Sequence, residues 1–156
     1  MVTLVPFTQD QWDPWLEAMI PAYAAGKARA GAWPADEALE RAVASVRDLL
    51  PDGMATPGHH VRSIVDDDGN HVGVLWYAPA DRIGVGSAYI YDFEIFEPFR
   101  GRGLGRAALV ALEPMVRELG YDAISLSVFG DNDVARALYR SSGYAESSVT
   151  MRKRLG

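Results

Sequence analysis

The chain has 156 residues, with 15 basic and 21 acidic side chains that give a net charge of −6, and it contains no cysteine. This length predicts a single domain over residues 1–156 with one sizeable core. The acidic balance argues against nucleic acid and anionic membranes as partners, and the lack of cysteine excludes disulfides, thiolate ligands and a cysteinyl intermediate. Because the sequence shows neither a signal peptide nor an apolar run long enough to span a bilayer, we expect a cytoplasmic protein.

Apolar spacing and turn residues predict the elements in chain order. Thr8 and Gln11 stand at capping-box spacing, and Asp-Gly within residues 66–70 is typical of a hairpin turn. The expected elements are a strand over 4–7, helices over 12–23 and 39–50, strands over 61–65 and 71–77, a turn region over 79–86, a strand over 88–96, a helix opening at 101–105 and ending at Gly120, a strand over 123–129, a helix over 131–142, and a last bent strand or hairpin over 144–154. The order favours a sheet covered by helices.

Further expectations concern particular side chains. Regular alternation in the strand over 88–96 would place Tyr89, Tyr91, Phe93 and Ile95 on one face, and Ile90, Asp92, Glu94 and Phe96 on the other. The four tryptophans, Trp12, Trp15, Trp33 and Trp76, are expected mainly in the core, with the rim of the acceptor groove as the alternative. Pro114 should kink the helix that contains it. Three poorly spaced histidines do not form a metal-binding pattern, so no metal is expected.

The segment Arg100-Gly101-Arg102-Gly103-Leu104-Gly105-Arg106 joins a strand to a helix. The first turn of a helix has unpaired N–H groups and a partial positive charge, and glycines let an anion approach them. The segment therefore predicts a cradle for a phosphate-bearing cofactor, although a tight turn that needs glycine only for its backbone angles, with a solvated arginine face, is the alternative. It lacks the lysine of a P-loop. The dinucleotide pattern also fails, because no acidic residue ends the next strand.

The same segment resembles the Arg/Gln-x-x-Gly-x-Gly/Ala signature of the GNAT superfamily of acyl-CoA N-acyltransferases. A second block resembles that family's strand, Asn-led helix and LY…GY ending; it consists of Leu126-Ser127-Val128, Asn132, Ala135, Leu138-Tyr139 and Gly143-Tyr144. The N-terminal half is most similar to a poorly characterised bacterial subgroup. The resemblance spans nearly the whole chain and implies an α/β (α+β) GNAT-like fold, with a central mixed, mostly antiparallel sheet that has two parallel splayed strands and is flanked by about four helices.

The resemblance implies acetyl-CoA as co-substrate, without a metal. It assigns the backbone of Ile95 and Phe96, on a bulged strand, to the pantetheine arm. The diphosphate would be bound by the residues of the glycine turn, with Arg100 and Arg102 as the main charged contacts: Arg100, Gly101, Arg102, Gly103, Leu104, Gly105 and Arg106. Asn132 would also contact the cofactor, and it could equally be a helix N-cap.

The implied reaction is direct acetyl transfer, in a ternary complex, to a primary amine of a small molecule or peptide. Tyr139 would protonate the leaving thiolate, unless it is only a packed core residue. The amine must lose a proton, and Glu94, ahead of Asp92, is the expected base, because neighbouring carboxylates can raise one another's pKa. His59 and His60 are alternative bases, or else solvated loop histidines.

Two other functions fit the same residues. One is a non-catalytic acyl-CoA-binding or sensor module of the same fold, and the other is acylation of a hydroxyl group with a histidine base. A homodimer that pairs through the C-terminal strand is expected from the family. The acceptor itself stays open, because in this fold the N-terminal helices and loops build its pocket.

Overall fold

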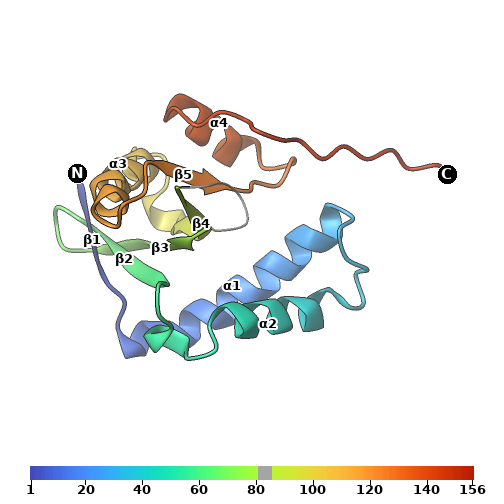
Figure 1. Ribbon diagram of the computed structural model, residues 1–156, viewed down its shortest axis with the longest axis horizontal. Helices are drawn as coiled ribbons and strands as arrows, with labels where there is room; N and C mark the ends of the chain where they lie inside the picture. Colours follow the sequence, from blue (N-terminus) through green and yellow to red (C-terminus); the bar gives the residue numbers. More distant parts are fainter. Residues whose placement is uncertain (81–85) are drawn as a thin grey trace.

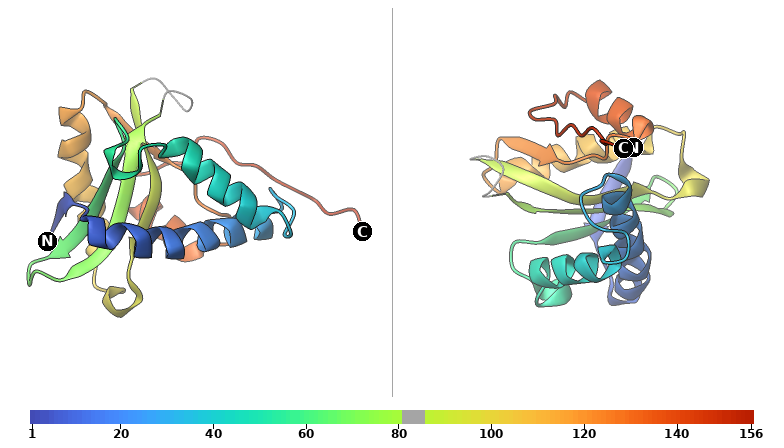
Figure 2. Two further views of the ribbon diagram at one scale, coloured as in Figure 1. Left: turned by 90° about the horizontal axis from the view of Figure 1, so that it is seen from below. Right: turned by 90° about the vertical axis from the view of Figure 1, so that its right-hand side faces the viewer.

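The computed structural model describes residues 1–80 and 86–156. A five-stranded sheet in the order β1-β2-β3-β4-β5 separates two layers of helices, with α1 and α2 on one face and α3 and α4 on the other (Figures 1 and 2). Strands β1 to β4 run antiparallel to their neighbours, and β5 runs parallel to β4. The elements are β1 (Val2–Pro6), α1 (Gln9–Arg29), α2 (Ala38–Leu49), η1 (Gly53–Ala55), β2 (His60–Asp66), β3 (His71–Pro79), β4 (Ser87–Ile95), η2 (Glu97–Phe99), α3 (Leu104–Glu118), β5 (Ala123–Leu126) and α4 (Asp133–Ser141).

The mixed, mostly antiparallel sheet and its flanking helices confirm the fold that the sequence predicts. At the start of α1, Gln11 Oε1 accepts the backbone N–H of Thr8 at 2.9 Å, as the capping-box spacing indicates. Pro114 lies inside α3 without dividing it. Residues 81–85 of the turn expected at 79–86 lie outside the described residues.

Helix α1 ends at Arg29, beyond the end predicted at residue 23, and packing explains why a glycine stands inside it. The helix continues through Gly26 to Arg29, although glycine weakens a helix interior. A Cβ at position 26 would lie 2.3 Å from Cε2 of Phe129, so the ring of Phe129 needs the space that this glycine leaves. Gly26 therefore brings α1 into contact with the segment that follows β5.

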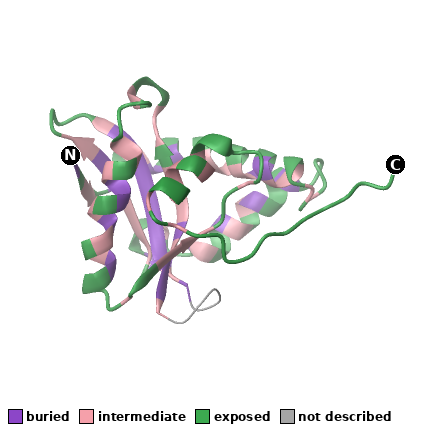
Figure 3. Ribbon diagram, turned by 90° about the horizontal axis from the view of Figure 1, so that it is seen from above, coloured by how far each residue is buried: buried purple, intermediate pink, exposed green. Residues whose placement is uncertain are grey.

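The C-terminal strand expected over residues 144–154 is absent. The segment after α4 is extended and leads away from the domain (Figures 1 and 3), and it leaves Val149, Met151 and Leu155 exposed at 59%, 88% and 92%. A strand needs a hydrogen-bonding partner, and none of the strands in the described residues pairs with this segment. Its attachments are side-chain contacts, from Arg136 and Arg140 to Glu146 and from Arg152 to the carbonyl of Gly31.

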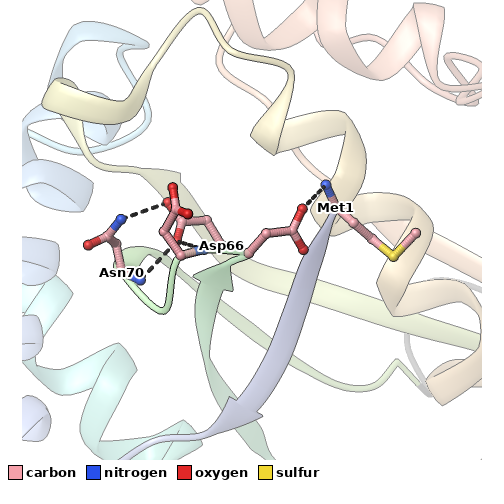
Figure 4. A network of polar contacts seen from close by, with 5 residues as sticks. Met1, Asp66 and Asn70 are labelled. Carbon is pink, nitrogen blue, oxygen red and sulfur yellow. Dashed lines mark hydrogen bonds and ion pairs between the residues drawn. The ribbon is translucent and has the colours of Figure 1, made fainter.

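The turn between β2 and β3 is the hairpin that Asp-Gly indicates. Asp66 Oδ1 accepts the N–H groups of Asp68 and Asn70 at 3.0 and 2.8 Å, and Gly69 takes a φ of 85° (Figure 4). The Asn70 side chain donates to Asp66 Oδ2 at 3.0 Å. This bond is the main cause that lowers the pKa of Asp66. The N-terminal amine of Met1 pairs with Asp67 beside this turn.

Two apolar clusters, one on each face of the sheet, hold the layers together. β3 is buried along most of its length (Figure 3), and its side chains from Val74 to Tyr77 alternate between the two clusters. The cluster below α3 includes Ile64, Leu75, Tyr77, Ile90, Leu109, Leu112 and Val116. The cluster below α1 and α2 includes Phe7, Trp12, Trp15, Val46, Leu50, Val74 and Trp76. Three of the four tryptophans are thus buried, and Trp33 is half-buried against Tyr23.

Candidate functional site

Strands β4 and β5 separate part of the way along the sheet. Their parallel pairing runs from Ser87 and Ala123 to Ile90 and Leu126, where β5 ends, and β4 continues to Ile95. Beyond Ile90, the side of β4 that faced β5 has no strand beside it among the described residues. The gap lies between the end of β4 and the segment that follows β5, so it is the splay that the sequence predicts.

A β-bulge in β4 lies at the point where the splay begins. Trp76 pairs with Asp92 and Tyr77 with Ile90, so Tyr91 is the extra residue. The bulge shifts the alternation of side chains by one residue. Ile90 consequently shares the α3 face with Phe93 and Ile95, whereas Tyr91 packs on the α1 face.

This shift corrects the faces expected for residues 88–96. Regular alternation put Ile90 with the acids and Tyr91 with Phe93, and both placements are wrong, because a bulge changes the period of two locally. Asp92 and Glu94 do share a face, since their cross-strand partners Trp76 and Val74 both belong to the cluster below α1.

The backbone of β4 presents unpaired groups toward the splay. The N–H of Phe96 donates to the carbonyl of Val72 at 2.8 Å, so these two residues form a hydrogen-bonded pair. In an antiparallel ladder the next pair, Gly73 and Ile95, is then non-hydrogen-bonded, and the backbone groups of Ile95 point away from β3. The same alternation turns the backbone groups of Phe93 toward the splay.

Ile95 and Phe96 therefore differ in what their backbones can bind. Both backbone groups of Phe96 are engaged within the chain, because its carbonyl also accepts the N–H of Phe99 at 2.9 Å. The carbonyl of Ile95 accepts a hydrogen bond from the Nε–H of Arg100 at 2.7 Å, and this exposed contact is one that a ligand can displace. Of the two residues assigned to the pantetheine arm, Ile95 has the suitable orientation, together with Phe93.

Asp92 is half-buried beneath α1, and its carboxylate is held by a tryptophan. Oδ2 accepts the indole N–H of Trp15 at 2.8 Å. Burial raises the pKa of Asp92 to about 6, with a smaller rise from Glu94, and the bond from Trp15 opposes both. A carboxyl group with that pKa is ionised at neutral pH and can still take up a proton, as a general base must.

Glu94 is exposed and forms an ion pair with Arg100. The distance from Arg100 Nη2 to Glu94 Oε1 is 3.4 Å, and the two side chains are 56% and 47% exposed. An exposed ion pair is weak, so Glu94 remains available to a ligand. The structure thus brings both acids to one face, with Asp92 in the more enclosed position.

His59 has a proton arrangement that makes it a poor base. Its Nδ1 accepts the indole N–H of Trp76 at 3.0 Å, which puts the proton of the neutral ring on Nε2. Burial, followed by the neighbouring His60, lowers the pKa of His59. His60 stacks on Tyr77 with ring centroids 5.0 Å apart, and burial, followed by Arg62, lowers the pKa of His60. Both rings pack against aromatic side chains rather than extending into solvent as loop histidines.

Tyr139 lies on α4, on the opposite side of the splay from α1. Its ring packs against Phe93 at 6.4 Å and Tyr144 at 5.7 Å. Burial raises the pKa of Tyr139 to about 12, and the nearby Tyr144 and Asp92 add to the rise. The hydroxyl therefore stays protonated over the whole neutral range and can donate a hydrogen bond.

The glycine turn forms the start of α3. Gly101 and Gly103 both take a φ of 76°, in the left-handed region, and a Cβ at either position would meet no atom within 4 Å. Within the described residues, no acceptor is found for the N–H groups from Gly101 to Arg106. Gly105 fits closely under α4, because a Cβ there would lie 3.1 Å from Leu138 Cδ2. The turn therefore presents free N–H groups to a ligand.

The three arginines of the turn are exposed, and each makes contacts within its own chain. Arg102 donates to the carbonyl of Pro98 at 3.2 Å and lies over the ring of Phe99. Arg106 donates to the carbonyl and hydroxyl oxygens of Ser141 at 2.8 and 2.7 Å, and so links the start of α3 to the end of α4. Arg100, which donates to the carbonyl of Ile95, and Arg102 line the turn. Arg106 instead holds two helices together.

Asn132 is the N-cap of α4. Its side chain accepts the N–H of Ala135 at 3.1 Å, which is the structural role that the sequence left as an alternative. The exposed side chain still has its amide N–H groups for a ligand.

Two cavities in the described part of the chain lie away from the splay. One of about 350 Å³ is between α3, the start of β5 and residues 142–145. A second of about 220 Å³ lies beside η1, His59 and His60. Residues 1–80 and 86–156 contain no group of three or more His, Asp or Glu side chains that could hold a metal ion. Over the same residues, no helix combines the length and the apolar character of a membrane span.

The mixed sheet, the bulged and splayed strand and the glycine turn at the start of α3 define the class of GNAT-fold proteins. The sequence matches the Acetyltransferase (GNAT) family over residues 12–144. The chain belongs to this family, as its motifs indicate.

Relatives of known sequence and structure agree with this assignment. The chain is 36% identical to the uncharacterized N-acetyltransferase YycN of Bacillus subtilis (strain 168), with 99% of each chain covered. It is 32% identical to a second such protein of that organism, YdgE, over 98% of each. The crystal structure of YycN superimposes with a TM-score of 0.92 over 99% of both chains. AAC(6′)-Iy, in complex with the bisubstrate analogue CoA-S-monomethyl-acetylneamine, has the same fold at a TM-score of 0.58 and 13% identity, over 100% of this chain and 97% of that one.

One residue of the site was beyond the reach of sequence motifs. Trp15 recurs at helical spacing with other apolar residues, and that pattern predicts only a core position. Its bond to Asp92 joins residues 77 positions apart, and only the packing of α1 on the sheet brings them together.

Proposed function

We propose that the protein is an acetyl-CoA-dependent N-acetyltransferase that acetylates a primary amine of a small molecule or peptide. The observation that carries the proposal is the pair of groups at the splay, a half-buried carboxyl with a pKa of about 6 and a protonated phenol with a pKa of about 12. An amine acylation needs these two functions, a base for the ammonium and a donor for the departing thiolate.

The cofactor would lie along the splayed strand. Its pantetheine arm would pair with the backbone groups of Phe93 and Ile95 that face away from β3, as an added strand pairs with a sheet edge. The diphosphate would accept the free N–H groups from Gly101 to Arg106, with Arg100 and Arg102 neutralising its charge. Asn132 would add a contact through its amide. We propose that the reaction needs no metal and takes place in the cytoplasm.

Direct transfer in a ternary complex follows from the available nucleophiles. The chain has no cysteine, the usual nucleophile of a covalent route, and this favours direct attack by the amine nitrogen. The amine nitrogen bonds to the thioester carbon, the carbon–sulfur bond breaks, and the amine proton passes to Asp92. A β4 backbone N–H facing the splay would stabilise the thioester oxygen as it gains charge.

Asp92 is the better candidate for the base, and Glu94 is the second. The carboxyl of Asp92 is more enclosed and has the raised pKa, whereas Glu94 is exposed and paired with Arg100. With both acids on one face, a cationic acceptor would be attracted to this end of the strand. Tyr139 would donate its proton to the thiolate sulfur.

A binding experiment and a turnover experiment together test this function. Calorimetry with coenzyme A tests the cradle, and mass spectrometry tests a panel of cationic, neutral and peptide amines with acetyl-CoA. Amide products support the proposal. Binding without turnover across the panel replaces it with the acyl-CoA-binding module, hydroxylamine-sensitive products indicate an ester and a hydroxyl acceptor, and no binding of coenzyme A overturns all three functions.

The C-terminal segment supports a homodimer. Among residues 1–80 and 86–156, β4 is the one strand that pairs with β5, and the extended residues 145–156 carry exposed Val149, Met151 and Leu155. The open edge of β5 and this segment are complementary, because a sheet edge pairs with an extended chain. We expect light scattering to give twice the chain's mass, and a chain ending after Gly143 to be monomeric. A full-length monomer would contradict this pairing.

A further inference from the structure

Trp15 is the side chain most directly attached to Asp92. It is 7% exposed, on the face of α1 that covers the sheet. Its ring packs against Phe7 at 5.7 Å, Trp12 at 5.1 Å and Trp76 at 5.6 Å, all between ring centroids. These contacts fix the plane of the indole and therefore the direction of its N–H, which meets Asp92 Oδ2 at 2.8 Å.

The bond acts on the charged form of the carboxyl group. An indole N–H only donates, so it stabilises the carboxylate, which only accepts. The backbone N–H of Phe93 gives the carboxylate a second, weaker stabilising hydrogen bond, and lone pairs of the carboxylate remain to take a proton. Burial and Glu94 both favour the neutral acid, and the indole opposes them. Without it, Asp92 would be more often protonated and free to rotate.

We propose that Trp15 is a positioning residue that keeps Asp92 ionised and oriented for proton uptake from the acceptor amine. The inference rests on the proposed function, in which Asp92 is the base. It adds a residue from α1, outside both GNAT motifs, to the machinery on β4 and α4. The N-terminal half of the chain then supplies part of the catalytic geometry as well as the acceptor pocket.

The neighbouring Trp12 separates this role from core packing. Trp12 lies in the same cluster, on the same helix, and is equally buried at 7%. No hydrogen bond joins Trp12 to Asp92 within the described residues. Replacing either ring by phenylalanine removes similar packing, and only the change at position 15 removes the bond.

The other groups that face Asp92 set the background of the test. Glu94 lies on the same strand, with its charge paired to Arg100, and Tyr139 faces Asp92 from α4. On β3 its cross-strand partner is Trp76, and on α1 the contact is Trp15, neither of which titrates. Deleting the indole N–H leaves all these groups in place.

The test compares Trp15→Phe, Trp12→Phe and a variant with β-(3-benzothienyl)alanine at position 15, which keeps the bicyclic shape and lacks the N–H. The readouts are the acid limb of the kcat/KM profile with acetyl-CoA and an amine accepted by the wild type, and the ¹³C NMR titration of the Asp92 carboxyl in the free protein. Loss of a hydrogen bond to a charged group should move both midpoints up by about one pH unit for both changes at position 15. Trp12→Phe should move neither.

The outcomes distinguish this inference from the proposed function. If Asp92→Asn abolishes turnover but neither change at position 15 moves either midpoint, the positioning role is overturned and the base assignment stands. If Asp92→Asn keeps full turnover, the base assignment fails and the positioning role fails with it, even where the NMR midpoint moves. Should Trp15→Phe not fold, the benzothienyl variant decides, because it preserves the core.

Discussion

Asp92 carries a charge in a place that disfavours it. Its carboxyl lies beneath α1 beside a second acid, and the indole N–H of Trp15, followed by the backbone N–H of Phe93, offsets part of the cost. Tyr139 is the complementary case, because burial keeps its proton in place. The two side chains come from different elements, and Tyr139 is near enough for the charge of Asp92 to add to the rise of its pKa, which gives this end of β4 its proposed chemistry.

Asp92→Asn should make the protein more stable and almost inactive. A rise in pKa from 3.8 to about 6 corresponds to roughly 3 kcal/mol at most, and remaining hydration reduces this. We expect the free energy of unfolding in urea at pH 7.5 to increase by about 1–2 kcal/mol and kcat to fall about 100-fold. Glu94→Gln is the control on the same face and should change stability little. Unchanged turnover of Asp92→Asn would contradict its role.

Tyr139→Phe should slow the reaction without weakening cofactor binding. Loss of a proton donor costs about 10²-fold in rate, whereas the ring and its packing on Phe93 remain. Because the pKa of Tyr139 is about 12, transfer of its proton to a free thiolate is uphill, so the proton would pass to the sulfur while the carbon–sulfur bond is still breaking. Tyr144→Phe is the matched control, since burial raises the pKa of Tyr144 to about 12 as well. An equal loss of rate in both variants would indicate packing only.

At the scale of elements, the start of α3 combines two glycines in the left-handed region with free N–H groups. The conformation presents those groups and also limits which residues can stand there. Arg106 then fixes α3 against the end of α4, so the turn and Tyr139 keep a constant relation. The bulge at Tyr91 likewise fixes the direction of a side chain on β4, because it turns Asp92 toward α1.

Gly103→Ala should weaken coenzyme A binding more than its effect on stability explains. A Cβ at a φ of 76° costs about 1–2 kcal/mol, and relief of that strain would redirect the N–H groups. Gly120→Ala, with a φ of 90° at the other end of α3, carries similar strain away from the turn. We expect both variants to lose similar stability in urea, and only Gly103→Ala to lose affinity by calorimetry, by about 10-fold. Equal affinities would show that the turn does not bind the diphosphate.

At the scale of the whole molecule, buried titratable groups make stability depend on pH with opposing signs. The pKa values of His59 and His60 are lowered on folding, so the unfolded chain binds more protons below about 6.5 and stability is lost as pH falls. The pKa of Asp92 is raised, so the folded chain binds more protons between 3.8 and about 6, and stability is gained as pH falls through that window.

Urea unfolding at pH 7.5 and pH 5.5 should separate these contributions. We expect wild-type stability to fall over this interval, a His59→Gln and His60→Gln double variant to lose less, and Asp92→Asn to lose more. A double variant with the wild-type pH dependence would show that these histidines titrate alike in both states.

The extent of prediction from sequence differs between elements. The hairpin at Asp66–Asn70, the capping of α1 and the glycine turn follow from residues within a few positions of each other, and all three are present. The strand expected over 144–154 is absent although its residues favour one, because a strand forms only against a partner edge. The faces predicted for Ile90 and Tyr91 were wrong, since a bulge depends on the register with β3.

The sequence by itself determined the family, the order of most elements and the glycine turn at the start of α3, because each depends on local spacing or on short motifs. Only the tertiary structure decided that Asp92 is enclosed beneath α1, that Trp15 and Trp76 donate to Asp92 and His59, and that Ile95 rather than Phe96 turns its backbone to the splay. Those features depend on contacts between residues far apart in the chain. The protonation and orientation of a side chain follow from the solvent that packing removes and the partners that it supplies.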